Sequence, residues 1–515
     1  MTPARYIPII GLEIHVRLRT KTKMFCSCPN VDDSTAPNTA ICPVCTGQPG
    51  ALPALNAEAV RLGVRAGLAL ECTIPDQAHF DRKNYFYPDL PKGYQISQFD
   101  FPIAENGQFI IDVPKKDALP NRERIRIGIT RAHLEEDAAK NIHDSASSSS
   151  LIDFNRASVP LTEIVTEPDV RSPAEAKAFL QELQLLLRSL RISEADMEKG
   201  YMRCDANVSL LPVDEQGLKL QPDFNPKIEI KNLNSFRAVE RAITYEMERQ
   251  RLMLEKGEMP RGATRGWDEN KGETFDQRSK ETSADYRYFP EPDLPPVSLA
   301  EIREEEKARM PELPIETRER LQEEWGFSVD DARFFVANEG WVEYVEEVMG
   351  ELGTWLAATD EGKESAGDVL KNRRTEIAKL AGGWFTTKLA GLLSANNKTI
   401  RDVKISPENF AEFLHLIDDG AINSANAQKL LTLMMEKGTD PSHLLEEHNL
   451  GQMDDANALA ETVASILQQN SDQVAQIRAG KVALVKWFVG CIMKATEGRA
   501  NPEQAEVEVK KQLGL

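Results

Sequence analysis

Short runs of alternating apolar and polar residues recur in the first half of the chain. Residues 12–18 place an apolar side chain at every second position, and Ile125, Ile127 and Ile129 do the same. A period of two is typical of a β-strand with one buried face. Shorter runs with this period cover residues 208–210 and 228–230. The first half is therefore predicted to be rich in β-strands.

Helical patterns interrupt these strands and then replace them. Residues 174–190 and 236–255 predict helices, and Ser172 followed by Pro173 is a typical helix start. The proline cluster at 290–296 marks a boundary. Beyond it, helices are expected at 407–419, 423–437, 455–469 and 482–496.

These patterns predict an α+β protein with three domains. The predicted limits are 1–297 for a mixed, β-rich domain, 298–405 for an all-α helical domain and 406–515 for an α-helical tail domain. At roughly 100–200 residues per domain, the length of 515 residues agrees with this division.

The composition fits a folded chain in the cytoplasm. Hydrophobic residues make up 41% and charged residues 28%, which excludes a disordered chain. The sequence contains neither a long apolar run nor a secretory signal, so no membrane association and a cytoplasmic location are expected. The net charge of -20, concentrated after residue 297, provides no general attraction for nucleic acids.

Four of the seven cysteines lie close together near the N-terminus. Cys26 and Cys28 are followed by Cys42 and Cys45. Two close pairs separated by a short loop can supply four thiolates to one tetrahedral metal, and four thiolates favour a closed, structural zinc site. The alternative is a set of reduced free thiols. The zinc-binding insertion is predicted near residues 26–45.

Acidic side chains and histidines accompany several of the β-like runs. Glu13 and His15 lie two residues apart and so point to one face of their predicted strand. Further acidic groups are Glu135, Glu136 and Asp137 after the strand near 125–129, together with Glu163, Glu167 and Asp205. Oxygen ligands with an occasional imidazole suit magnesium or manganese. For any single carboxylate, a solvated surface group remains the alternative.

Several common catalytic signatures are missing from the sequence. It contains no phosphate-binding Gly-x-x-x-x-Gly-Lys-Ser/Thr loop, no Gly-x-Gly-x-x-Gly and no Gly-x-Ser-x-Gly. A simple P-loop ATPase, a dinucleotide enzyme and a serine hydrolase of the α/β type are therefore not indicated.

Six stretches together resemble one protein family over essentially the whole chain. They are residues 11–15 (GLEIH), 81–98 (DRKNYFYPDLPKGYQISQ), 133–137 (HLEED), 203–207 (RCDAN), 231–235 (KNLNS) and 285–293 (DYRYFPEPD). The chain resembles the B subunits of bacterial aspartyl/glutamyl-tRNA(Asn/Gln) amidotransferases. The eighteen-residue stretch is far more specific than any short motif.

The resemblance implies a function in protein biosynthesis. Such an enzyme is a ligase that uses ATP to phosphorylate the side-chain carboxylate of glutamate or aspartate misacylated onto tRNA(Gln) or tRNA(Asn). Ammonia then displaces the phosphate and gives Gln-tRNA(Gln) or Asn-tRNA(Asn). The family takes its ammonia from glutamine in an amidase A subunit, and a small C subunit joins A and B in a heterotrimer. The first domain would be a cradle-like kinase and transamidase domain, and the tail would bind tRNA.

The resemblance also implies roles for individual residues. The matched magnesium ligands are Glu13, His15, Glu136 and Glu163, and Asp205 is added to the catalytic set. The residues matched to the ammonia passage are Lys83, Lys92, Tyr85 and Tyr87. The cysteines matched to the family's zinc site are Cys26, Cys28, Cys42 and Cys45. Candidate tRNA contacts in the tail are Lys481, Lys486, Lys494 and Arg499. The implied cofactors are ATP, Mg²⁺ and structural Zn²⁺.

Two other functions stay open at this point. The chain would be a non-catalytic scaffold that docks tRNA if all chemistry belonged to its partners, but a scaffold has no need of a magnesium site. A zinc hydrolase requires an open metal position, which a four-cysteine site does not provide. The sequence does not distinguish Glu-tRNA(Gln) from Asp-tRNA(Asn), and it identifies neither the ATP contacts nor the orientation of the tail on tRNA.

Overall fold

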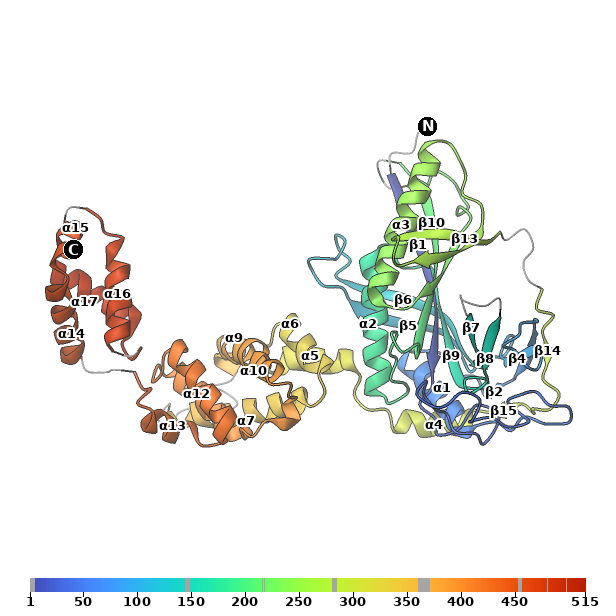
Figure 1. Ribbon diagram of the computed structural model, residues 1–515, viewed down its shortest axis with the longest axis horizontal. Helices are drawn as coiled ribbons and strands as arrows, with labels where there is room; N and C mark the ends of the chain where they lie inside the picture. Colours follow the sequence, from blue (N-terminus) through green and yellow to red (C-terminus); the bar gives the residue numbers. More distant parts are fainter. Residues whose placement is uncertain are drawn as a thin grey trace. The chain divides into compact units, whose positions relative to one another are not determined.

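A computed structural model describes residues 5–143, 149–214, 216, 218–279, 285–359, 371–452, 456–478, 480–496 and 498–515 (Figure 1). The chain forms two compact units, Met1–Pro314 and Ile315–Leu515. Among the described residues, no helix is both long and apolar enough to cross a membrane.

An eight-stranded sheet organises the described part of the first unit. Its strands are β1 (Arg5–Arg17), β5 (Ala104–Asp112), β6 (Arg124–Glu136), β9 (Pro160–Thr166), β10 (Met202–Val213), β11 (Ile228–Leu233), β12 (Ala263–Asp268) and β13 (Glu273–Ser279). Their order across the sheet is β13-β12-β11-β10-β1-β9-β6-β5. The β11–β12 pair is parallel, and the other pairs are antiparallel. The N-terminal strand β1 therefore lies between β10 and β9 in the middle of the sheet.

Helices cover one face of this sheet. Helix α1 (Ala57–Ala69) packs on β5 and β6, α2 (Pro173–Ser189) packs on β5 and on α3 (Phe236–Glu255), and α3 packs on β10 and β11 (Figure 1). Ile10, Leu12, Ile14 and Val16 of β1 are at most 1% exposed, because they point into the core shared with these helices. Since side chains alternate along a strand, Glu13, His15 and Arg17 lie on the opposite face.

A smaller sheet brings a distant segment beside the first hundred residues. It has the order β14-β3-β4, with β3 (Asp81–Asn84), β4 (Tyr94–Ser97) and β14 (Phe289–Pro290). Two hydrogen bonds of 2.7 and 2.8 Å join the Arg82 guanidinium to the buried Glu291 carboxylate, which fixes this pairing. The remaining short strands are β2 (Gln77–Ala78) with β15 (Val297–Ser298), and β7 (Lys140–His143) with β8 (Ser150–Asp153).

Helix α4 (Ala300–Ala308) ends the first unit, and the described part of the second unit is helical. Its helices are α5 (Pro314–Glu324), α6 (Val329–Ala337), α7 (Trp341–Thr359), α9 (Arg374–Gly383), the π-helical turn Trp384–Leu389, α10 (Ala390–Ala395), the 3₁₀ turn Ile400–Asp402, α11 (Pro407–Asp418), α12 (Ser424–Lys437), α13 (Pro441–Glu447), α14 (Ala456–Gln469), α15 (Ser471–Arg478), α16 (Leu484–Ala495) and α17 (Pro502–Leu513). They build two apolar cores, one between Leu321 and Leu450 and one between Leu459 and Val509.

The structure confirms the predicted α+β class. The predicted helices correspond to α2, α3, α11, α12, α14 and α16, although residue 455 of one prediction lies outside the described residues. The Ser172 hydroxyl accepts a hydrogen bond from the Glu175 amide, as expected of a cap. The domain limits 297/298 and 405/406 remain predictions, and the core between Leu321 and Leu450 packs residues from both sides of the second limit.

Candidate functional site

A row of polar side chains crosses the middle of the main sheet. His15 on β1 is the register partner of Arg203 on β10 and of Glu163 on β9, and Glu163 is the partner of His133 on β6. Register partners project from the same face of a sheet. Glu135 follows His133 by two residues and shares that face. This row lies on the face opposite to helices α1, α2 and α3.

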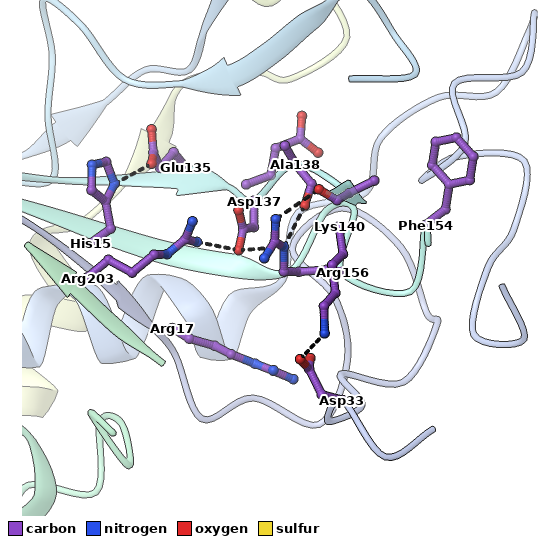
Figure 2. Close-up of polar contacts among 12 residues, drawn as sticks. His15, Arg17, Asp33, Glu135, Asp137, Ala138, Lys140, Phe154, Arg156 and Arg203 are labelled. Carbon is purple, nitrogen blue, oxygen red and sulfur yellow. Dashed lines mark hydrogen bonds and ion pairs between the residues drawn. The ribbon is translucent and has the colours of Figure 1, made fainter. Parts of the chain in front are cut away.

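Four of these side chains form a tight cluster. His15 Nδ1 lies 3.0 Å from Glu135 Oε1, the contact drawn in Figure 2, and 3.9 Å from Glu163 Oε2. His133 Nε2 lies 3.2 Å from Glu163 Oε2. The side chains of Glu135 and Glu163 are only 2% and 10% exposed. Both carboxylates are therefore held largely away from water.

The cluster is strongly coupled electrostatically. Burial alone would lower the pKa of His15, but its hydrogen bond to Glu135 and the charges of Glu135 and Glu163 raise it to about 9. Burial alone would raise the pKa of Glu163, and the neighbouring histidines hold it well below its ordinary value instead. Both carboxyl groups are therefore ionised at neutral pH, which is the form that binds a cation.

His15, Glu135 and Glu163 suit a hard divalent cation whose binding displaces the proton of His15, because only the neutral imidazole is a ligand. One ligand atom from each of the three lies within 4.8 Å of the others. Magnesium is commonly bound by one or two carboxylates together with substrate phosphates. Two buried carboxylates and one imidazole, with further positions left for a phosphate, fit that chemistry.

Glu136 lies apart from this group, although the resemblance implied that Glu136, and not Glu135, is a magnesium ligand. A Glu136 oxygen pairs with the Lys92 ammonium and accepts a hydrogen bond of 2.9 Å from the Ile96 amide. Strand β6 continues to Glu136 instead of ending near residue 129, so neighbouring glutamates point to opposite faces. The register of β6 shifts between Ile129 and Arg131, so the core face passes from Ile129 to Leu134. Simple alternation in the sequence gives no signal for this shift, and so none for Glu135.

Glu13 and Asp205 border the cluster without joining its ligand atoms. Glu13 shares the face of His15, and its carboxylate accepts a hydrogen bond of 2.8 Å from the Asn207 amide. Asp205 accepts a hydrogen bond of 2.5 Å from the Lys231 ammonium. The magnesium role that the resemblance implied for Glu13 and Glu136, and the catalytic role that it implied for Asp205, stay predictions.

A cavity of about 260 Å³ adjoins the cluster on the side of Glu13. Its walls are Ile9, Gly11, Leu12, Glu13, Val165, Thr166, Pro168, Asn207, Ser209, Phe224, Asn225 and Lys227. Gly11 keeps the strand backbone open to this cavity, while the half-exposed Phe224 ring and the exposed Lys227 lie at its other side. An aromatic ring, an ammonium and a carboxylate at one cavity are a typical polar and apolar mixture for a small ligand.

The residues predicted for an ammonia passage lie on and after β3. Burial alone would lower the pKa of Lys83, but the charges of Glu135 and Glu163 raise it. Its ammonium lies 5.1 Å from the centre of the Tyr286 ring. Tyr85 packs edge to face against Tyr286.

The aromatic side chains form a continuous row beside Lys83. The ring centroids of Tyr85 and Tyr87 are 6.4 Å apart, those of Tyr286 and Tyr288 are 6.1 Å apart, and Tyr288 stacks on Phe99 at 4.2 Å. Lys92 lies apart from this row, with its ammonium 5.8 Å from the centres of the Phe25 and Tyr94 rings. Thus Lys83 interacts electrostatically with Glu135 and Glu163, and Lys92 pairs with Glu136.

The four N-terminal cysteines converge, as their spacing predicted. One sulfur from each of Cys26, Cys28, Cys42 and Cys45 lies within 4.8 Å of the others. A hydrogen bond from Cys26 lowers the pKa of Cys45 to about 4, with further help from the Cys42 amide and the Lys23 charge. The fully buried Lys23 amine lies 3.6 Å from Cys45 Sγ. A converging set of thiols next to a positive charge fits a structural zinc ion.

The candidate tRNA contacts of the tail lie on and beside α16. Lys481, Lys486 and Lys494 are exposed, and the exposed Trp487 lies next to Lys486. The half-buried Arg499 donates to the Thr496 carbonyl at 3.2 Å. The exposed aromatic ring among these cations is a feature that the sequence pattern did not indicate.

Together the fold and the site define a sheet-based catalytic domain that is followed by helical domains. Residues 8–304 match the family model described as "GatB/GatE catalytic domain", and residues 368–513 match the "GatB domain". The similar proteins include the B subunit of the aspartyl/glutamyl-tRNA(Asn/Gln) amidotransferase from Thermotoga maritima, which is 44% identical over 514 residues and covers 99% of both chains.

Proteins of the same name from other bacteria are similarly close. The protein from a Synechococcus strain is 42% identical over 99% of this chain and 98% of its own length, and that from Thermomicrobium roseum is 43% identical over 96% of both. This chain belongs to the family of aspartyl/glutamyl-tRNA(Asn/Gln) amidotransferase B subunits.

Proposed function

We propose that this chain is the subunit of a tRNA-dependent amidotransferase that activates and amidates the side chain carried by a misacylated tRNA. ATP would phosphorylate the side-chain carboxylate of Glu-tRNA(Gln) or Asp-tRNA(Asn). Ammonia would then form a bond to the carbonyl carbon while the bond to the phosphate oxygen breaks. The observation that carries the proposal is the buried cluster of His15, Glu135 and Glu163 beside a cavity of about 260 Å³.

The cluster favours this enzyme over a scaffold that only docks tRNA. A scaffold gains nothing from two buried, ionised carboxylates, whose desolvation is costly unless a charged group offsets it. His15, Glu135 and Glu163 would hold Mg²⁺, which supplies positive charge to the phosphates of ATP when bound. The cavity beside Glu13 would hold the nucleoside part of ATP, because from there the phosphates reach the cluster along β1.

The surroundings of the cluster suit an acyl phosphate. This intermediate reacts with water unless water is excluded, and Glu135 and Glu163 lie in a site with little exposure.

Reconstitution tests the proposed function directly. The chain would be combined with the amidase A and small C subunits and supplied with each misacylated tRNA, ATP and glutamine. We expect amidated tRNA and ADP in equal amounts, and no product without ATP. Amidation that proceeds without ATP, or no amidation of either tRNA, would overturn the proposal.

We propose further that Lys83 and its aromatic row line the path by which ammonia reaches the cluster. The row from Tyr87 through Tyr85 and Tyr286 ends beside Lys83, which interacts electrostatically with Glu135 and Glu163. Lys92, paired with Glu136, would line a second part of this path.

Substitution of Lys83 is expected to separate amidation from activation. Lys83→Ala should reduce glutamine-dependent amidation roughly tenfold, since one buried, charged contact contributes about 1.5 kcal/mol. ADP formation in the presence of misacylated tRNA should fall much less. Lys177→Ala, which removes a surface lysine paired with Glu240, is the matched control. Equal loss of amidation and ADP formation would contradict a passage role.

We propose that exposed cations of α16 contact the tRNA backbone. Double substitution Lys486→Glu and Lys494→Glu should weaken tRNA binding and reduce the slope of log K against log salt by about 2, because each phosphate contact contributes about 1. Binding titrations at several salt concentrations measure this. The double substitution Lys398→Glu and Lys404→Glu, at two exposed lysines outside the predicted tail, controls for the same change in net charge. An unchanged slope would exclude these contacts.

A further inference from the structure

A second hollow, of about 290 Å³, lies at the ends of β1 and β10. Its lining includes the side chains of Arg17, Arg156, Arg203 and Tyr201, with Lys199 and Asn234 also at its wall. Its cations, four in all, outnumber its carboxylates, which are Asp33, Asp137 and Glu198. This is a local positive site in a chain whose net charge is -20.

The strand register places this hollow directly beside the cluster of His15, Glu135 and Glu163. His15 pairs with Arg203, and the next row on the same face consists of Arg17 and Tyr201, joined by a backbone hydrogen bond of 2.9 Å. Two residues along a strand span about 6.8 Å. The cavity beside Glu13 lies on the other side of His15 along β1. Strand β1 therefore passes the cavity, the cluster and the hollow in that order.

Two of the four cations of the hollow are held in place by contacts within the protein. Arg203 Nη2 lies 2.6 Å from Asp137 Oδ2, and Arg156 Nε lies 3.5 Å from the same oxygen (Figure 2). Arg156 also donates to the carbonyls of Ala138 and Ala139 at 3.1 and 2.9 Å. These two guanidinium groups are thus held beside the hollow, where their remaining N–H groups can bind an anion.

The hollow also offers surfaces that a ribonucleotide uses. The Arg17 guanidinium lies 4.8 Å from the centre of the Tyr201 ring and forms a stacked pair with it. Proteins commonly stack unpaired bases on aromatic rings and guanidinium planes, and bind the phosphate with arginine. The exposed Asn234 adds an amide that can donate to and accept from a base edge.

We propose that this hollow binds the 3′-terminal nucleotide of the aminoacylated RNA, so that the esterified amino acid extends along β1 to His15, Glu135 and Glu163. The inference rests on the proposed function, because that function requires the carboxylate of an amino acid carried by RNA to reach the cluster. The separation of one register row leaves room for an esterified glutamate or aspartate to extend from the hollow to the cluster. The cations of the hollow would also suit the phosphates of ATP. The experiment therefore measures effects on RNA binding and on the KM for ATP separately.

The test compares binding of intact tRNA with binding of the same tRNA trimmed of its 3′-terminal nucleotide, using the complete complex. The wild type should bind the intact tRNA about tenfold more tightly, as expected for one stacked base. Arg17→Met and Tyr201→Ala should bind both forms equally and keep the KM for ATP. Arg19→Met, an exposed arginine paired with Glu194, should keep the preference for the intact end.

Two further readouts make the outcome decisive. Lys199→Gln changes an exposed side chain and should fold normally, so it should lose part of the preference even where the other variants unfold. A tenfold preference retained by all variants, or a raised KM for ATP with the preference intact, would overturn the assignment. Failure of the wild-type complex to amidate tRNA would instead refute the proposed function, independently of these variants.

Discussion

Glu135→Gln should reduce ATP-dependent amidation by the reconstituted complex by about 10³-fold, because a metal ligand supplies several kcal/mol of charge stabilisation. The same variant should lose tight binding of Mn²⁺, used as a spectroscopic substitute for Mg²⁺, in the presence of ATP. Glutaminase activity of the partner amidase should persist. His15→Ala and Glu163→Gln should behave alike, since their ligand atoms converge with those of Glu135.

Glu136→Gln is the matched control for this prediction. It makes the same chemical change one residue away, on the other face of β6, where the carboxylate pairs with Lys92. We expect Mn²⁺ binding close to that of the wild type. Loss of Mn²⁺ binding by Glu136→Gln but not by Glu135→Gln would restore Glu136, the residue suggested by the sequence, to the metal site.

Cys45→Ser should abolish stoichiometric zinc and lower the melting temperature of the first unit by about 10 °C. A structural zinc ion contributes directly to folding. Once the metal is lost, the polar segment that carries the four cysteines has no apolar core of its own to keep it folded. Elemental analysis and calorimetry measure the two effects. Cys491→Ser, which changes a half-buried cysteine of the tail, should alter neither. Less than half an equivalent of zinc in the purified wild type would contradict the assignment.

The local elements followed from the sequence because their signals are local. Alternation along residues 12–18 predicted β1, and Ser172 with Pro173 marked the start of α2. The convergence of the four cysteines also followed from their spacing. In each case the deciding residues lie within a few positions of one another.

The site itself depended on pairings between distant strands. Nothing near His15 in the sequence indicates that Glu163 and Arg203 are its register partners, or that residues 285–293 lie beside β3. The choice of Glu135 over Glu136 depends on the irregularity in β6 between Ile129 and Arg131, because a shift of one residue exchanges the two faces. The hollow beside Arg17 and Tyr201 was missed for the same reason.

The net charge also takes a different meaning once the fold is known. An acidic chain has little general affinity for RNA, but four cations gathered in one hollow form a local field that total charge does not reveal. The shape and position of such sites, rather than overall attraction, would select the RNA.

The central place of β1 has a consequence for synthesis of the chain. Its edges pair with β9, at residues 160–166, and with β10, at residues 202–213, so the strand made first waits for partners made much later. At translation rates of roughly 5–20 residues per second, the second edge stays open for about 10–40 s. An unpaired strand edge with buried-type side chains is a template for aggregation. The nascent N-terminus is therefore a natural client for chaperones that bind extended apolar segments.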